Sequence, residues 1–146
     1  MVRSLPAMSL AVQVVFDCHD ADVLADFWAK ALEYVPEPPP GGFDTWEAFL
    51  EANDFPLPEP GSISAVVDPA GVGPRLLFKR VPENKVVKNR VHLDVRADDR
   101  RDHKVAELEA AGGEVLRRVT EQGRSFITMA DPEGNELDVT GTSPDD

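Results

Sequence analysis

The stretch RVHLDVRADD, residues 90–99, alternates apolar and polar side chains and ends in two aspartates. One side of this extended segment is apolar and consists of Val91, Leu93, Val95 and Ala97. The other side is polar and consists of His92, Asp94 and Arg96. A repeat of two residues is typical of a β-strand with two different faces. We therefore expect one face in the core, and ask what the face that carries His92 is for.

A matching strand opens the N-terminal half, in VQVVFDC at residues 12–18, where Gln13 takes the place of His92. Asp20 is suited to cap a helix after this strand. Apolar residues then recur at helical spacing, namely Val23, Leu24, Phe27, Trp28, Ala31 and Leu32. After the later strand, Asp98 or Asp99 can cap a second helix with Val105, Leu108 and Ala111, which ends at Gly112. Both halves thus predict a strand followed by a helix.

Each half continues with strands and a tight turn. SISAVVDPAGVGPRLLFKR, residues 62–80, has a DPAG turn between two strand patterns, after a weaker strand near Tyr34. EVLRRVT and RSFITMA, residues 114–120 and 124–130, are followed by DPEG and by the strand pattern NELDVTG. We interpret residues 1–146 as one domain made of two copies of one unit, about 10–82 and 88–141.

The composition excludes several classes of partner. Fifteen basic and 27 acidic residues give a formal net charge of −12, which argues against nucleic acid and against an anionic membrane surface. Cys18 is the single cysteine, so an internal disulfide is excluded and a reducing compartment is expected. The start of the chain lacks a cleavage site after its apolar residues, and we expect a cytoplasmic protein.

One segment belongs to the first unit alone. GFDTWEAFLEANDFPLPEPG, residues 42–61, predicts an inserted helix, with Asp44 and Glu47 at capping-box spacing and an apolar side made of Trp46, Phe49 and Leu50. A helix this short is marginal in water and has to dock its apolar side on the protein. Because the other helices occupy one face of the sheet, we expect it to act as a lid at the mouth of a cleft on the other face.

The alternation within each strand also predicts the lining of that cleft. The expected cleft-facing residues are Arg75, Leu77 and Lys79 on one strand, Phe126 and Thr128 on another, and Glu136, Asp138 and Thr140 on the last. A mixture of apolar side chains and a few converging polar groups is typical of small-molecule pockets. The alternative for His92 is a cleft histidine that only forms hydrogen bonds with Asp94, Asp138 or water.

The duplicated unit, with its DP-x-G turns before the last strands, resembles the vicinal oxygen chelate superfamily. That superfamily includes glyoxalases, bleomycin-resistance proteins, fosfomycin-resistance enzymes and extradiol dioxygenases. RLLFKRVPENK, KNRVHLDVRADD and MADPEGNELDV, at residues 75–85, 88–99 and 129–139, are similar to its glyoxalase-like domain proteins. The resemblance implies an α+β fold in which two βαβββ units form an eight-stranded half-open barrel, here with the inserted helix in the first unit.

The resemblance further implies one divalent metal ion (Fe, Mn, Ni, Zn or Co) held by Gln13, His92 and Asp138, with Glu136 as a candidate base. Leu77 departs from the pattern, because it stands where a glutamate ligand is often found. A protein without a metal is therefore the alternative. The expected substrate contacts are Leu77, Lys79, Asp94, Phe126 and Trp46.

Two functions remain open at this point. One is a metal-dependent lyase, isomerase or dioxygenase that acts on a small oxygenated molecule through its vicinal oxygens. The other is a metal-free protein that binds or sequesters a small molecule, as bleomycin-resistance proteins do. An interaction module with a vestigial cleft is a third and weaker hypothesis. The resemblance also implies a homodimer, and no nucleic acid or membrane partner is expected.

Overall fold

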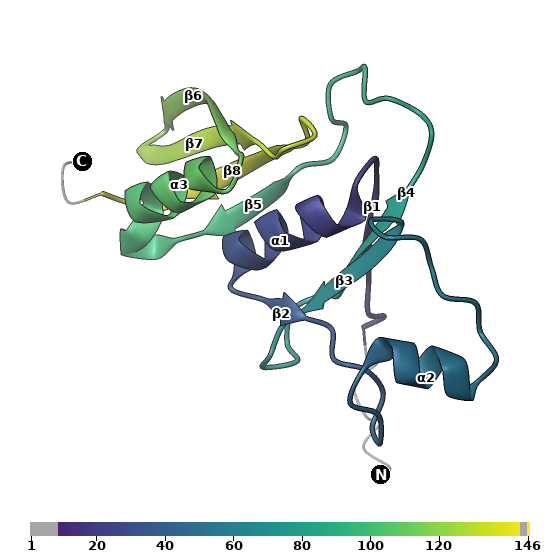
Figure 1. Cartoon of the computed structure of the whole chain (residues 1–146). Coiled ribbons are helices and arrows are strands. Elements are labelled where there is room, and N and C mark those ends of the chain that lie inside the picture. The colour runs from purple at the N-terminus through teal and green to yellow at the C-terminus, as the bar shows by residue number, and fades with distance from the viewer. Residues whose placement is uncertain (1–8, 144–145) are drawn as a thin grey trace, which may run out of the picture.

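The computed structural model describes residues 9–143 and 146 and contains two βαβββ units, with one additional helix in the first (Figure 1). The first unit consists of β1 (Val14–Cys18), α1 (Ala21–Leu32), β2 (Val35–Pro36), α2 (Trp46–Ala52), β3 (Ile63–Val67) and β4 (Leu76–Arg80). The second consists of β5 (Leu93–Arg96), the 3-10 turn η1 (Asp98–Arg100), α3 (Arg101–Ala110), β6 (Glu114–Glu121), β7 (Arg124–Ala130) and β8 (Glu136–Thr140). The α+β fold class and the inserted helix are confirmed.

The strands of each unit form a four-stranded sheet with the same order. The first sheet runs β1-β4-β3-β2 and the second runs β5-β8-β7-β6. In both, the first strand pairs in parallel with the last, and the remaining pairs are antiparallel. The parallel pair places Leu93 opposite Leu137 and Asp94 opposite Asp138 in the second sheet. The repeated topology confirms the duplication seen in the sequence.

Helix α1 covers one face of the first sheet. Its N-cap is Asp20, as predicted, and the Asp20 carboxylate accepts hydrogen bonds from the backbone N–H groups of Asp22 at 3.1 Å and Val23 at 3.2 Å. Leu24 and Trp28 of this helix are fully buried. The prediction for Val23 was wrong: the helix turns this side chain away from the sheet, and it is 46% exposed.

The core lies on the helix-facing sides of the strands. The predicted core-facing residues of β4, β7 and β8 are buried, namely Leu76, Phe78, Ile127, Met129, Leu137 and Val139. The Phe16 ring of β1 packs between Trp28 and Phe78, with ring centroids 4.9 Å and 5.2 Å away. One continuous cluster of buried side chains includes residues of both units. The opposite faces of these strands therefore remain available for a site.

The DPEG turn of the second unit forms hydrogen bonds with α1 and with the residues just before it in the first unit. The indole Nε1 of Trp28 donates to the carboxylate of Asp131 at 3.0 Å. The carboxylate of Glu133 accepts from the backbone N–H groups of His19 at 2.6 Å and Asp20 at 3.0 Å. The two Glu133 hydrogen bonds satisfy N–H groups that precede the first turn of the helix, and all three hydrogen bonds join the two units.

Two predicted caps differ from the structure. Neither Asp98 nor Asp99 caps α3: both lie in η1, so their carboxylates stand one turn too early to reach the free N–H groups of that helix. The cap of α2 is Thr45 rather than Asp44, because the Thr45 hydroxyl accepts from the backbone N–H of Ala48 at 3.1 Å. Among the described residues, no helix combines the length and apolarity needed to cross a bilayer.

Candidate functional site

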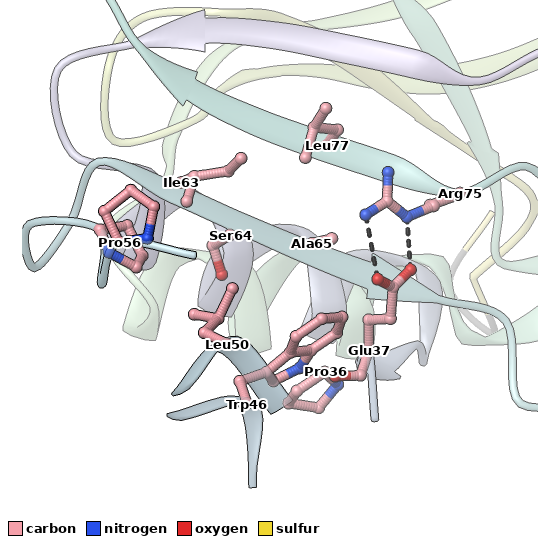
Figure 2. Close-up of a pocket in the computed structure, with 11 residues that line it drawn as sticks. Pro36, Glu37, Trp46, Leu50, Pro56, Ile63, Ser64, Ala65, Arg75 and Leu77 are labelled. Atoms are coloured by element: carbon pink, nitrogen blue, oxygen red, sulfur yellow. Dashed lines mark hydrogen bonds and ion pairs between the residues drawn. The ribbon is translucent and has the colours of Figure 1, made fainter. Parts of the chain in front are cut away.

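The first sheet has a cavity on the face opposite α1. Leu76 and Phe78 of β4 point toward α1 and are fully buried, whereas Leu77 between them lines the cavity with Arg75. Trp46 and Leu50 of α2 line the same space at its rim (Figure 2). Its volume is about 470 Å³. The inserted helix therefore borders the open face of the sheet, where the lid hypothesis places it.

The cavity wall is mainly apolar. Besides Trp46, Leu50 and Leu77, it includes Pro36 of β2, Ile63 and Ala65 of β3, and the prolines Pro56 and Pro58 of the connection after α2. Glu37, Ser64 and Arg75 are its polar members. Figure 2 shows Arg75 and Glu37 joined at one end, with Pro56 at the other end. The proline-rich connection that follows α2 thus contributes part of the wall.

Within the described residues, one hydrogen bond links helix α2 to the segment after β2, and ring contacts link it to the connections on either side. The indole Nε1 of Trp46 donates to the backbone carbonyl of Glu37 at 2.8 Å. The Phe49 ring lies 5.4 Å from Phe43, 5.8 Å from Trp46 and 6.3 Å from Phe55, between ring centroids. None of the seven residues of α2 is buried. Trp46 is therefore held in one orientation at the cavity, and Phe49 supports it from the side.

An ion pair neutralises the polar end of the cavity. The Arg75 guanidinium donates from Nε and Nη2 to the two carboxylate oxygens of Glu37, and the Nη2 bond measures 3.0 Å. The hydrogen bond with Glu37 raises the pKa of Arg75, so this side chain stays charged. Arg75 Nη1 also donates to Oε1 of Gln13 at 2.7 Å. The amide oxygen that was expected to bind a metal is thus engaged by Arg75.

A cluster of metal-ligand type lies on the second sheet. Nε2 of His92 is 3.2 Å from Oδ2 of Asp138 and 3.4 Å from Oδ1 of Asp94. Because β5 pairs with β8 in parallel and Asp94 lies opposite Asp138, the two carboxylates share one face of the sheet. Oδ1 of Asp138 accepts from the Thr128 hydroxyl at 2.5 Å, which orients this carboxylate. One ligand atom from each of the three residues lies within 4.8 Å of the others.

The donor set of this cluster fits a divalent ion. Neighbouring ligands that bind one ion at about 2.1 Å lie roughly 3.0–3.4 Å apart, which is the range of the two separations measured from His92. One imidazole with two carboxylates suits Mn, Fe or Zn. Asp94 thus stands as a candidate ligand, although the sequence had suggested a substrate contact. The sequence feature that could have identified Asp94 as a ligand is its position two residues after His92, which places both on the same strand face.

The other expected site residues fall into different places. Glu136 lines a smaller cavity of about 210 Å³ together with His92, and Lys88 Nζ lies 2.8 Å from its carboxylate. The hydrogen bond with Lys88 lowers the pKa of Glu136, which makes this carboxylate a weaker base. Lys79 is exposed and Phe126 is half-buried, and neither lines the cavity beside α2. The structure therefore brings Trp46 and Leu77 together in one space, and His92 with Glu136 in another.

Comparisons with known proteins agree with this architecture. The family model described as glyoxalase-like domain matches residues 13–140. No curated protein matches the chain. A glyoxalase/bleomycin resistance protein/dioxygenase family enzyme from Burkholderia phytofirmans PsJN is 14% identical over 88% of this chain and 95% of its own, with a TM-score of 0.61. Lactoylglutathione lyase from Agrobacterium tumefaciens is 16% identical over 94% and 96%, with a TM-score of 0.56.

A third similar structure is a variant of the fosfomycin resistance protein FosX from Listeria monocytogenes, complexed with Mn(II) and 1S,2S-dihydroxypropylphosphonic acid. It is 10% identical over 93% of each chain, with a TM-score of 0.63. The family model covers most of the present chain, and the solved structures share its fold. The chain therefore belongs to the glyoxalase-like domain family and has the fold of the vicinal oxygen chelate superfamily.

Proposed function

We propose that this protein binds a small organic molecule in the cavity beside α2. The observation that carries the proposal is the cavity itself, at about 470 Å³. Ligand sites typically measure about 300–1,000 Å³ and combine an apolar wall with a few polar groups. The FosX relative, which was solved with a small phosphonic acid, supports the use of this fold for small molecules. Binding in this cavity uses none of the residues of the His92 cluster.

The residues of the cavity contribute to binding in different ways. Leu77 and Ala65 provide the floor, and burial of an apolar ligand against them supplies most of the affinity. Trp46 offers a large aromatic surface that its hydrogen bond to Glu37 holds in place. The Arg75–Glu37 pair closes one end without a net charge. This arrangement selects a ligand by size and apolarity and requires no chemical step.

The Trp46→Ala variant tests the proposal. A screen of small organic molecules by thermal shift supplies the probes, and calorimetry gives their affinity. We expect the variant to bind these hits about tenfold more weakly, because an aromatic contact and its buried area are lost. The unfolding temperature is expected to fall by only about 2–4 °C, because Trp46 is 36% exposed and α2 has no buried residue.

Phe55→Ala provides the matched control. Phe55 belongs to the same group of rings through Phe49, yet it does not line the cavity. This variant is expected to keep the wild-type affinity. If Trp46→Ala lost stability in proportion to binding, or if Phe55→Ala weakened binding equally, α2 would be only a structural support and the proposal would fail.

A second candidate function is a metal-dependent lyase, isomerase or dioxygenase at the His92 cluster. The separations from His92 to Asp94 and Asp138 favour it, since they match those of ligands around one ion. A bound divalent ion would polarise substrate oxygens as a Lewis acid. Thr128 donates to one oxygen of Asp138 and so leaves the other facing His92. Lys88 holds Glu136 in its charged form in the adjacent cavity.

We also propose a homodimer. Val15 of β1 and Val91 next to β5 are 47% and 77% exposed, and both line the smaller cavity. Large apolar side chains that gather on one surface mark association sites. We expect a sedimentation mass of about twice 16.0 kDa at micromolar concentration.

Val91→Glu is expected to return this mass to that of the monomer, because it places a charge among the apolar side chains. Val72→Glu, at an 89% exposed turn position that does not line the smaller cavity, is the control and should leave the dimer intact. A wild-type mass near 16.0 kDa would overturn the dimer.

A further inference from the structure

We infer that the ligand of the cavity beside α2 is an uncharged aromatic molecule. The inference rests on the proposed function, that this cavity binds an organic molecule, and adds the chemical class of the ligand. Two properties of the wall support it: its charge and the fixed position of its aromatic surface.

The charges of the wall cancel. Among the lining residues, Glu37 and Arg75 carry charge, and each carboxylate oxygen of Glu37 accepts from the guanidinium. A carboxylate or phosphate on the ligand would have to compete with Glu37 for Arg75 and would be repelled by it. An ammonium group would have to compete with Arg75 for Glu37 and would be repelled by Arg75. Because the burial of an unpaired charge is unfavourable, the wall selects against ions of either sign.

The aromatic surface is fixed before the ligand arrives. Trp46 Nε1 is bonded to the Glu37 carbonyl at 2.8 Å, and the edge-to-face contact with Phe49 has an interplanar angle of 85°. Figure 2 shows the indole beside Pro36 and below Leu50 at the rim of the cavity. A second ring that stacks on the fixed indole or meets its edge gains binding free energy beyond that of the buried area. An aromatic ligand gains this contact, and a saturated ligand of equal size does not.

Four probes of one size test the class. They are naphthol, naphthoate, naphthylmethylammonium and the saturated decahydronaphthol, with the substituent at the same ring position and at neutral pH. Calorimetry on the full chain gives each dissociation constant. We expect naphthol to bind about tenfold more tightly than each of the other three.

The two tryptophans report where the probes bind. In the amide NMR spectrum, the indole N–H signal of Trp46 is expected to shift with naphthol, because the ring lies at the cavity. The indole of Trp28 is buried and bonded to Asp131, so its signal is the internal reference and should not move.

Glu37→Gln tests the role of the ion pair directly. The variant leaves Arg75 without its carboxylate partner, so naphthoate is expected to gain at least about tenfold over its affinity for the wild type. If the affinities of the four probes kept the same order in this variant as in the wild type, the argument from charge would be overturned. Naphthoate or decahydronaphthol binding as tightly as naphthol to the wild type would overturn the ligand class alone. If no probe moved the Trp46 signal, the class and the proposed binding function would both fail.

Discussion

Replacing Asp131 with alanine is expected to lower the free energy of unfolding by about 3–5 kcal/mol, because several buried donors lose their acceptor at once. Asp131 is 4% exposed. Its carboxylate accepts from Trp28 Nε1 at 3.0 Å and from the backbone N–H groups of Glu133 and Asn135 at 2.9 Å and 3.0 Å. The Asn135 side chain donates a further hydrogen bond at 2.9 Å. Equilibrium unfolding in urea measures the loss.

The duplication of the chain supplies the control. Asp68 holds the corresponding DPAG turn in the first unit, where its carboxylate accepts from the backbone N–H groups of Ala70, Val72 and Gly73. Among the described residues Asp68 has no hydrogen bond to the other unit, and we expect a much smaller loss for Asp68→Ala. Equal losses for the two variants would show that the Trp28–Asp131 bond adds nothing to the joining of the units.

The contribution of the Asp68 turn to stability can also be measured through its dependence on pH. The backbone hydrogen bonds, that of Gly73 first, lower the pKa of Asp68 below its usual range. A carboxyl whose pKa is lower in the folded state stabilises the fold at neutral pH, and this contribution is lost as the pH falls through the folded pKa. The difference between wild type and Asp68→Ala should therefore shrink on acidification.

His92→Ala is expected to weaken the binding of Mn(II) or Zn(II) about hundredfold, since it removes one of three protein donors. Asp94→Ala should cause a loss of similar size, because Oδ1 of Asp94 lies 3.4 Å from the same imidazole nitrogen. Gln13→Ala should leave the affinity unchanged, since the Gln13 amide oxygen is bonded to Arg75 on the other sheet. Calorimetric titration of the metal-free protein measures all three.

His103→Ala is the matched control, because this histidine is exposed on α3 and lies outside the cluster. A loss for Gln13→Ala as large as that for His92→Ala would restore the ligand set of Gln13, His92 and Asp138 that the resemblance implied. A wild-type protein that bound neither ion would remove the second candidate function and leave the cavity beside α2 as the site.

The strand faces could be predicted because alternation is a local property. Burial of Leu137 and Val139 on one side of β8, with Glu136 and Asp138 on the other, follows from the repeat of two residues alone. The Asp20 cap was predictable for the same reason, since it acts on N–H groups two and three residues away. The position of α2 followed from the need of a short apolar helix for a surface to pack on.

The site could be predicted only in part, because its decisive contacts join distant residues. Arg75 reaches Gln13 across 62 positions of the sequence, and nothing in either segment signals this pairing. Asp94 becomes a candidate ligand because the register of β5 on β8 puts it opposite Asp138, and register is a property of the folded sheet. Glu37 had no signal, since it lies in a run of prolines that resembles a plain connection.

Because α2 has no buried residue, the residence time of a ligand in the cavity can change without a change in the stability of the protein. All seven residues of the helix stay outside the buried core, and its hydrogen bond to the sheet edge is that between Trp46 and Glu37. Local opening that breaks this contact exposes none of the core, so its free energy lies far below that of global unfolding. A bound molecule can then escape many times during the lifetime of one folded chain. Substitutions around α2 should therefore change the off-rate while the melting temperature stays nearly constant.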